Sequence, residues 1–87
     1  MKIKDGFVLR EVRNNYVVVA VGKRSNEFKG VINLNESGAL LFKALNKDVT
    51  KEDLIQVLLD NYEVSPEKAR ESVDMFIKKL IDGGLIE

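Results

Sequence analysis

The stretch GVINLNESGALLFKAL, Gly30 to Leu45, decides the fold. The four residues after its glycine have the pattern of a short strand, with Ile32 and Leu34 on one face. A helix is expected to begin almost at once, because the side chain of Asn35 or Ser37 can accept a hydrogen bond from an N–H of the first helical turn. No later segment has a strand pattern. The outer edge of this strand therefore has no later strand to pair with.

Two further strands are predicted before this stretch. Phe7–Arg13 is rich in β-forming residues, and Tyr16–Val21 is a nearly unbroken run of valines. Asn14–Asn15 separates them, and asparagine tolerates the positive φ that a tight hairpin turn requires. The polar residues 22–29 then predict a loop, with Phe28 as its anchor in the core.

Two more helices follow the first one. Thr50 and Asp53 have the spacing of a capping box, while Ser65 followed by Pro66 is typical of a helix start. Gly83–Gly84 predicts the end of the last helix, with the apolar residues after it folding back onto the core. The apolar residues that recur at helical spacing and are expected to be buried are Ala39, Leu41, Phe42 and Leu45, then Leu54, Ile55, Leu58, Leu59 and Tyr62, then Ala69, Val73, Phe76 and Leu80.

The order β-β-β-α-α-α predicts a single α+β domain spanning residues 1–87. Its three-stranded antiparallel sheet would be followed by a three-helix bundle, in a winged-helix-like arrangement. With 87 residues the core is small. A sheet of this kind is open and so has two edges.

The composition argues against several classes of function. The chain has no cysteine and no histidine, so thiolate chemistry, zinc binding through these side chains and a histidine base are excluded. We therefore expect no catalysis by this chain, no metal and no cofactor. The N-terminus lacks the apolar segment of a signal peptide, and no apolar run is long enough to cross a membrane. These features predict a cytoplasmic protein.

The charge is balanced overall but uneven along the chain. Residues 1–34 hold 7 basic and 3 acidic side chains, and residues 35–87 hold 7 and 11. A basic half can attract an anionic partner, although it can equally be an ordinary solvated face. A winged-helix nucleic-acid-binding domain is therefore an alternative hypothesis. It is disfavoured because the second helix carries one lysine, Lys51, against three acidic residues.

Two motifs resemble those of one family. The run LNESGALLF, Leu34 to Phe42, resembles the signature Leu-Asn/Asp-x-Thr-Gly-x-x-x-Trp of the PqqD family, with Ser37 for threonine and Phe42 for tryptophan. ARESVDMFIKKLIDGGLIE is similar to the C-terminal pattern of the same family, except that Ser72 stands where an aspartate is common. The resemblance extends over nearly the whole chain.

This resemblance implies a RiPP recognition element, a domain that captures the leader segment of a ribosomally synthesised and post-translationally modified peptide. Such a peptide chaperone presents the precursor to a modifying enzyme, often a radical SAM protein, as in the biosynthesis of pyrroloquinoline quinone. In the family the leader adds as a strand beside the third strand, in a groove against the third helix. The residues of this chain that carry over as peptide-binding are Gly30, Val31, Ile32, Asn33 and Leu34.

The last helix has a second stripe that could line such a groove. Arg70, Asp74, Ile77 and Ile81 share one line of the helix beside its core stripe. The two isoleucines could instead simply widen the core stripe. Basic residues around the 22–29 loop, which are Lys23, Arg24 and Lys29, could steer an acidic leader or merely be solvated. A further hypothesis is a homodimer in which two copies pair their third strands.

Overall fold

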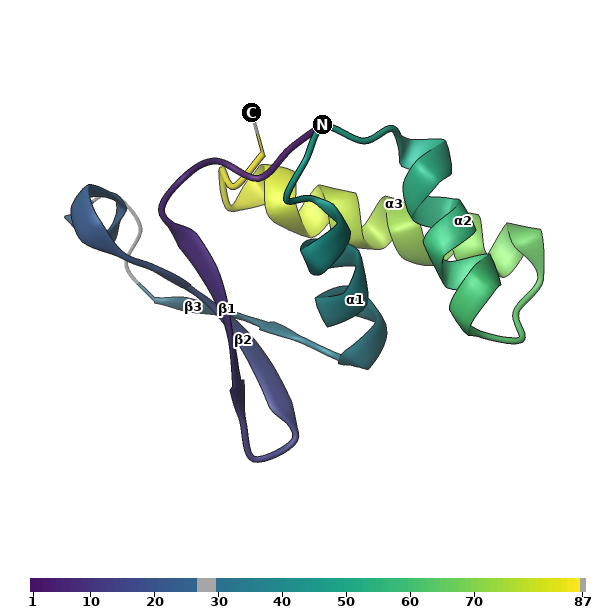
Figure 1. The fold of residues 1–87 in the computed structure, drawn as a ribbon, viewed down its shortest axis with the longest axis horizontal. Helices are drawn as coiled ribbons and strands as arrows, with labels where there is room; N and C mark the ends of the chain where they lie inside the picture. The colour runs from purple at the N-terminus through teal and green to yellow at the C-terminus, as the bar shows by residue number, and fades with distance from the viewer. Residues whose placement is uncertain (27–29, 87) are drawn as a thin grey trace.

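The computed structural model describes residues 1–26 and 30–86. The elements are β1 (Phe7–Val12), β2 (Asn15–Ala20), the 3-10 helix η1 (Gly22–Asn26), β3 (Val31–Leu34), α1 (Glu36–Ala44), α2 (Lys51–Asn61) and α3 (Pro66–Asp82). Figure 1 shows the twisted sheet on one side of the molecule and the helices on the other, with α1 between the sheet and α2. The predicted α+β order of three strands followed by three helices is confirmed.

The sheet is antiparallel, with strand order β1-β2-β3. The hairpin turn differs from the prediction by one residue, because Val12 pairs with Asn15 and the turn consists of Arg13 and Asn14. Both turn residues have positive φ, 50° and 69°. A two-residue hairpin turn of type I′ needs left-handed backbone at both positions, and this register assigns one of them to an arginine. The sequence pattern had favoured the two asparagines.

The three helices begin at the caps that the sequence predicts. For α1 the cap is Asn35, whose Oδ1 accepts from the Gly38 N–H at 2.8 Å, while the Ser37 hydroxyl donates to the same Oδ1 at 3.0 Å. Thr50 and Asp53 form a reciprocal capping box at the start of α2. Ser65 Oγ accepts from a backbone N–H of the first turn of α3, with proline at the first helical position. Side-chain oxygens therefore satisfy N–H groups at each helix start.

The end of α3 closes the fold against the N-terminal segment. Leu85 N–H donates to Leu80 C=O at 2.9 Å, and Gly84 N–H donates to Ile81 C=O at 3.0 Å. With φ of 73° at Gly84, these two bonds make a Schellman cap, and it turns Leu85 into the core as expected. A bridge between Ile3 and Ile86 then ties the two ends of the described chain together. Figure 1 shows the N and C marks on the same side of the molecule.

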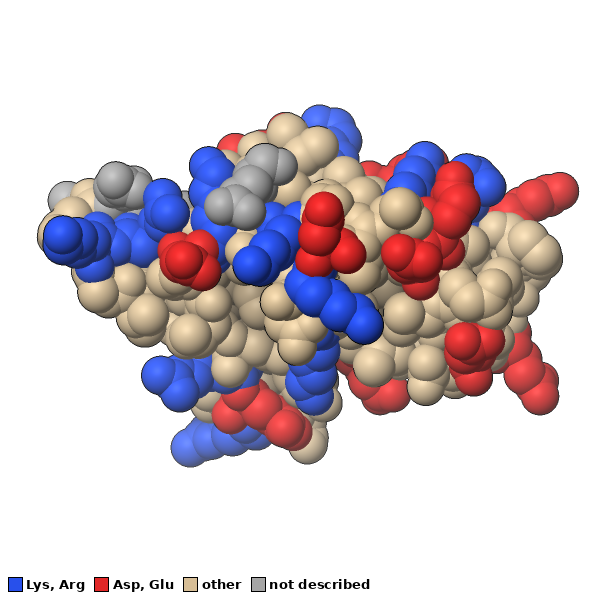
Figure 2. All heavy atoms as spheres, turned by 45° about the horizontal axis from the view of Figure 1, so that its top comes forward, with Lys and Arg blue, Asp and Glu red and all other residues tan. Residues whose placement is uncertain are grey.

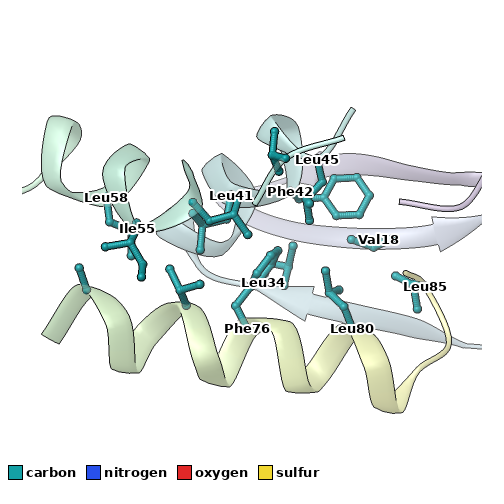
Figure 3. Close-up of a cluster of buried hydrophobic side chains, with 14 of the residues drawn as sticks. Val18, Leu34, Leu41, Phe42, Leu45, Ile55, Leu58, Phe76, Leu80 and Leu85 are labelled. Carbon is teal, nitrogen blue, oxygen red and sulfur yellow. The ribbon is translucent and has the colours of Figure 1, made fainter. Parts of the chain in front are cut away.

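The core lies between the sheet and the helices. Figure 3 shows side chains from α1, α2, α3 and the strands converging on this space. The predicted helix positions are buried, except that Leu59 and Tyr62 are only partly buried against the cluster. Val18 of β2 is fully buried and brings the sheet into the same core. Phe28, the predicted loop anchor, lies outside the described residues.

Within the described part of the chain, none of the helices combines the length and the apolar character that crossing a membrane would require.

Candidate functional site

The outer side of β3 is an open sheet edge. Because the strand order is β1-β2-β3, the inner side of β3 pairs with β2, and no other described strand pairs with its outer side. Val31 is 54% exposed and Asn33 is also exposed. Gly30 precedes the strand with φ of 118°, a conformation that favours glycine.

The hairpin determines which backbone groups of β3 are directed outward. A two-residue turn closes on a hydrogen-bonded pair, here Val12 and Asn15, and such pairs recur at every second position of an antiparallel ladder. The even-numbered residues of β2 consequently bond to the even-numbered residues of β3. The N–H and C=O groups of Val31 and Asn33 therefore point to the open side.

A hollow of about 530 Å³ adjoins this edge. Its walls come from the end of β3, the start of α1 and one flank of α3. The lining residues are Asn15, Asn33, Leu34, Asn35, Ser37, Gly38, Leu41, Ser72, Met75, Phe76 and Lys79. Leu34 and Phe76 both line the hollow, and Figure 3 shows them approaching each other from β3 and α3.

The C-terminal half of α3 runs alongside β3. Lys79 Nζ donates to the backbone oxygen of Asn33 at 3.4 Å. One turn further on, a Cβ added at Gly83 would lie 3.2 Å from Ile32 Cδ1, so glycine allows a close approach of helix and strand there. Residue numbers therefore increase along α3 in the direction in which they decrease along β3, so the two elements run antiparallel.

The sequence-predicted residues of α3 lie on another flank of the helix. Arg70 and Asp74 line another hollow with Ile55 of α2, and Met75 borders both this hollow and the one beside β3. The Asp74 carboxylate also forms an ion pair with Lys51, the first residue of α2. Both residues are therefore on the side of α3 that faces α2.

The two isoleucines of that stripe are placed differently from each other. Ile77 is partly buried against the core, whereas Ile81 is 61% exposed. Neither belongs to the described lining of the hollow beside β3. The part of this stripe in binding stays a prediction, and the flank of α3 that lines the hollow is the alternative to it.

Sequence reasoning did not select the flank of α3 that lies beside β3. This flank consists of Ser72, Met75, Phe76 and Lys79, and we call it the β3-facing flank. Its i, i+3, i+4, i+7 spacing is a helical stripe, but only Met75 and Phe76 are apolar. Met75 is 68% exposed. The signal available in the sequence is a methionine directly before the core phenylalanine Phe76.

A second hollow, of about 300 Å³, shares Asn35, Ser37 and Ser72 with the one beside β3. It continues toward the end of α2, where the Tyr62 hydroxyl donates to Glu36 Oε1 at 3.2 Å. Partial burial raises the pKa of Tyr62, and the negative charge of Glu36 raises it further. Tyr62 is therefore a neutral hydrogen-bond donor at physiological pH.

Basic side chains gather around the sheet half of the face shown in Figure 2, and acidic ones are frequent around the helices. Arg24, one of the residues expected to steer a partner, lies over the ring of Phe7 with 5.5 Å from its guanidinium carbon to the ring centroid. Its Nε also donates to the backbone oxygen of Asp5 at 3.1 Å. Lys23 is exposed, and Lys29 lies outside the described residues. Arg24 thus has a packing role in addition to its charge.

Two solved structures share this fold. One is TbiB1 in complex with the TbiA(beta) leader peptide, with a TM-score of 0.77, 18% identity and coverage of 100% of this chain and 95% of that one. The other is lasso peptide synthetase B1 complexed with the leader peptide, with a TM-score of 0.72, 19% identity and coverage of 97% and 93%. At these identities the likeness concerns the fold.

A comparison with curated proteins gave no match to this sequence. The sequence model of the family described as coenzyme PQQ synthesis protein D (PqqD) matches residues 15–86, which include β2, β3 and all three helices. The match takes in both motifs noted in the sequence and the whole region of the open edge. The chain belongs to the PqqD family.

Proposed function

We propose that this chain is a RiPP recognition element, which binds the leader segment of a ribosomally made precursor peptide. The leader adds as a fourth strand at the outer edge of β3 and places side chains in the hollow beside α3. The peptide-binding residues are then Gly30, Val31, Ile32, Asn33 and Leu34 of the strand region, together with the β3-facing flank. Family membership and the leader peptides named for both structural neighbours support this proposal.

The observation that carries the proposal is the combination of an open strand edge with an adjoining hollow. The edge offers the backbone N–H and C=O groups of Val31 and Asn33 to an incoming strand. At roughly 0.5 to 1.5 kcal/mol net for each hydrogen bond, they give only a few kcal/mol. Micromolar binding needs about −8 kcal/mol after the cost of ordering a flexible peptide. Apolar anchors must therefore contribute.

The hollow can receive such anchors. Its apolar lining comes from Leu34, Leu41, Met75 and Phe76, and its volume of about 530 Å³ is in the range of ordinary ligand pockets. Burying a leucine-sized side chain contributes roughly 1.5 to 3 kcal/mol. Added to the backbone hydrogen bonds, two anchors of this size would bring the binding free energy to the value of micromolar affinity.

We assign the chemistry of modification to a separate enzyme, with a radical SAM protein as the partner that the family implies. The chain has neither histidine nor cysteine to serve as an ordinary base or nucleophile. Its part is to hold the leader so that the rest of the precursor reaches the active site of that enzyme. The pathway would make pyrroloquinoline quinone or another modified peptide.

A titration with a synthetic leader of the precursor encoded beside this chain tests the proposal. We expect the amide signals of residues 31–34 and the methyl signal of Met75 to shift in NMR spectra of labelled protein. The methyl signal of Ile81, on the flank of α3 that the sequence predicts, tests the alternative groove and should remain unchanged. Shifts confined to α2, or no shifts at millimolar peptide, would contradict the proposed function.

A further inference from the structure

We infer that Lys79 gates the β3 edge and selects leaders that carry an aspartate or glutamate two residues from a large apolar side chain. This inference rests on the proposed function and names a chemical feature of the peptide. It comes from the position of one charged side chain in an otherwise neutral hollow.

Lys79 is the charged residue among the described residues that line the hollow beside β3. Its ammonium group donates to the backbone oxygen of Asn33, and the distance of 3.4 Å makes this a long hydrogen bond. No described carboxylate forms an ion pair with it. Its neighbour Lys78 differs, because Lys78 Nζ lies 3.1 Å from Asp82 Oδ2. Lys79 therefore supplies a positive charge that the described residues do not neutralise.

The acceptor of Lys79 is one of the outward groups that an added strand must use. When the N–H of an incoming peptide bonds to Asn33 C=O, the ammonium of Lys79 has to move away from that oxygen or share it. An ammonium pressed against an apolar peptide side chain loses hydration without compensation. A carboxylate on the peptide would instead give it a charge-assisted hydrogen bond. Acidic leaders are therefore favoured over neutral or basic ones.

The separation of the acidic and the apolar side chain in the peptide follows from the spacing of their two contact residues on α3. Met75 and Lys79 are four residues apart on α3, so they are separated by about 6 Å along the helix axis. Alternate residues of a strand are separated by about 6.6 Å and point to the same face. Since α3 runs antiparallel to β3, two side chains at positions i and i+2 of the added strand can contact Met75 and Lys79 together.

Lys79 also has a role when no peptide is bound. Open strand edges invite pairing with other copies, and a lysine at such an edge is a common protection. Its contact with Asn33 C=O occupies one of the outward acceptors of β3. The same side chain would then discourage pairing of β3 between copies and favour an acidic peptide.

Selection from a displayed library of random 12-residue peptides tests the inference. The full chain and its Lys79→Glu variant are used as baits, with Lys78→Gln as the matched control. We expect the wild type and the control to enrich Asp or Glu two positions from Leu, Ile, Phe or Met. The Lys79→Glu variant is expected to enrich Lys or Arg at the acidic position.

The measured affinities give the size of the effect. For one peptide selected by the wild type, Lys79→Gln should raise Kd about 2- to 5-fold, since Lys79 is exposed, and 1 M salt should reduce this difference. Enriched peptides without an acidic preference, still shifting the amides of β3, would overturn the inference and leave the proposed function standing. Failure of both baits to enrich any peptide that perturbs β3 would contradict the proposed function as well.

Discussion

The two flanks of α3 differ in how far their side chains are packed or paired within the protein. On the flank toward α2, Asp74 forms an ion pair with Lys51, and Ile77 packs against the core. On the β3-facing flank, Met75 is among the most exposed apolar residues, and Lys79 has one long bond to a backbone oxygen. The first flank helps to hold the bundle together. The second leaves apolar area and a charge available beside an open strand edge.

Apolar spacing alone therefore does not mark the flank of α3 that lies beside the open strand edge. The stripe with two isoleucines follows helical spacing, yet the hollow beside β3 is lined by a mixture of serine, methionine, phenylalanine and lysine. Binding surfaces need groups that the free protein leaves partly unsatisfied, while a strongly apolar stripe tends to be used by the core.

The largest effect is expected from removing an outward N–H of β3. Asn33→Pro takes away a group that points to the open side, so the ladder to β2 should persist. The proline ring also blocks the approach of a strand at this position. We expect leader affinity to fall at least 30-fold in calorimetry, with the far-ultraviolet circular dichroism spectrum unchanged.

Asn33→Ala is the matched control, because it keeps the backbone groups and should change affinity less than about twofold. Equal weakening by both variants would mean that the Asn33 side chain, and not the strand edge, makes the contact. The open edge of β3 would then no longer explain why one flank of α3 binds the peptide and the other does not.

An intermediate effect is expected from trimming one apolar residue on each flank. Met75→Ala should weaken leader binding about 5- to 15-fold, since burial of such a side chain contributes roughly 1.5 to 3 kcal/mol at most. Ile81→Ala, at a similarly exposed position of the same helix, should leave affinity unchanged. The reverse order of effects would show that the peptide lies on the other flank and that the isoleucine stripe forms the groove.

The smallest effect is expected from breaking the ion pair on the flank toward α2. Asp74→Asn removes the charge partner of Lys51 at a site where both side chains are at least a third exposed. Such pairs contribute roughly 0.2 to 1 kcal/mol, so urea unfolding should show a loss in that range with leader affinity unchanged. A clear loss of affinity without loss of stability would assign Asp74 to the binding site.

Much of the fold could be predicted from the sequence because its determinants are local. The caps at Asn35, Thr50 and Ser65 and the buried helix positions depend on residues a few places apart. The one-residue shift of the hairpin turn shows the ordinary limit of such reasoning, since the register is set by the pairing of whole strands.

The strand of the proposed site follows from the sequence more directly than the flank of α3 beside it. That the last strand has an open edge follows from its order in the chain, whereas the flank of α3 beside it depends on how the helix is rotated. That rotation is set by contacts between elements far apart in the sequence, such as the approach of Gly83 to Ile32. Local periodicity carries no information on these contacts.

Hydrogen exchange at the Asn33 amide tests most directly whether an added strand forms at β3. The account predicts rapid exchange in the free protein and at least 10-fold slower exchange once the leader is bound, with the amides that bond to β2 already protected before binding. An Asn33 amide that is protected in the free protein, or that stays unprotected at saturating leader, would contradict the account.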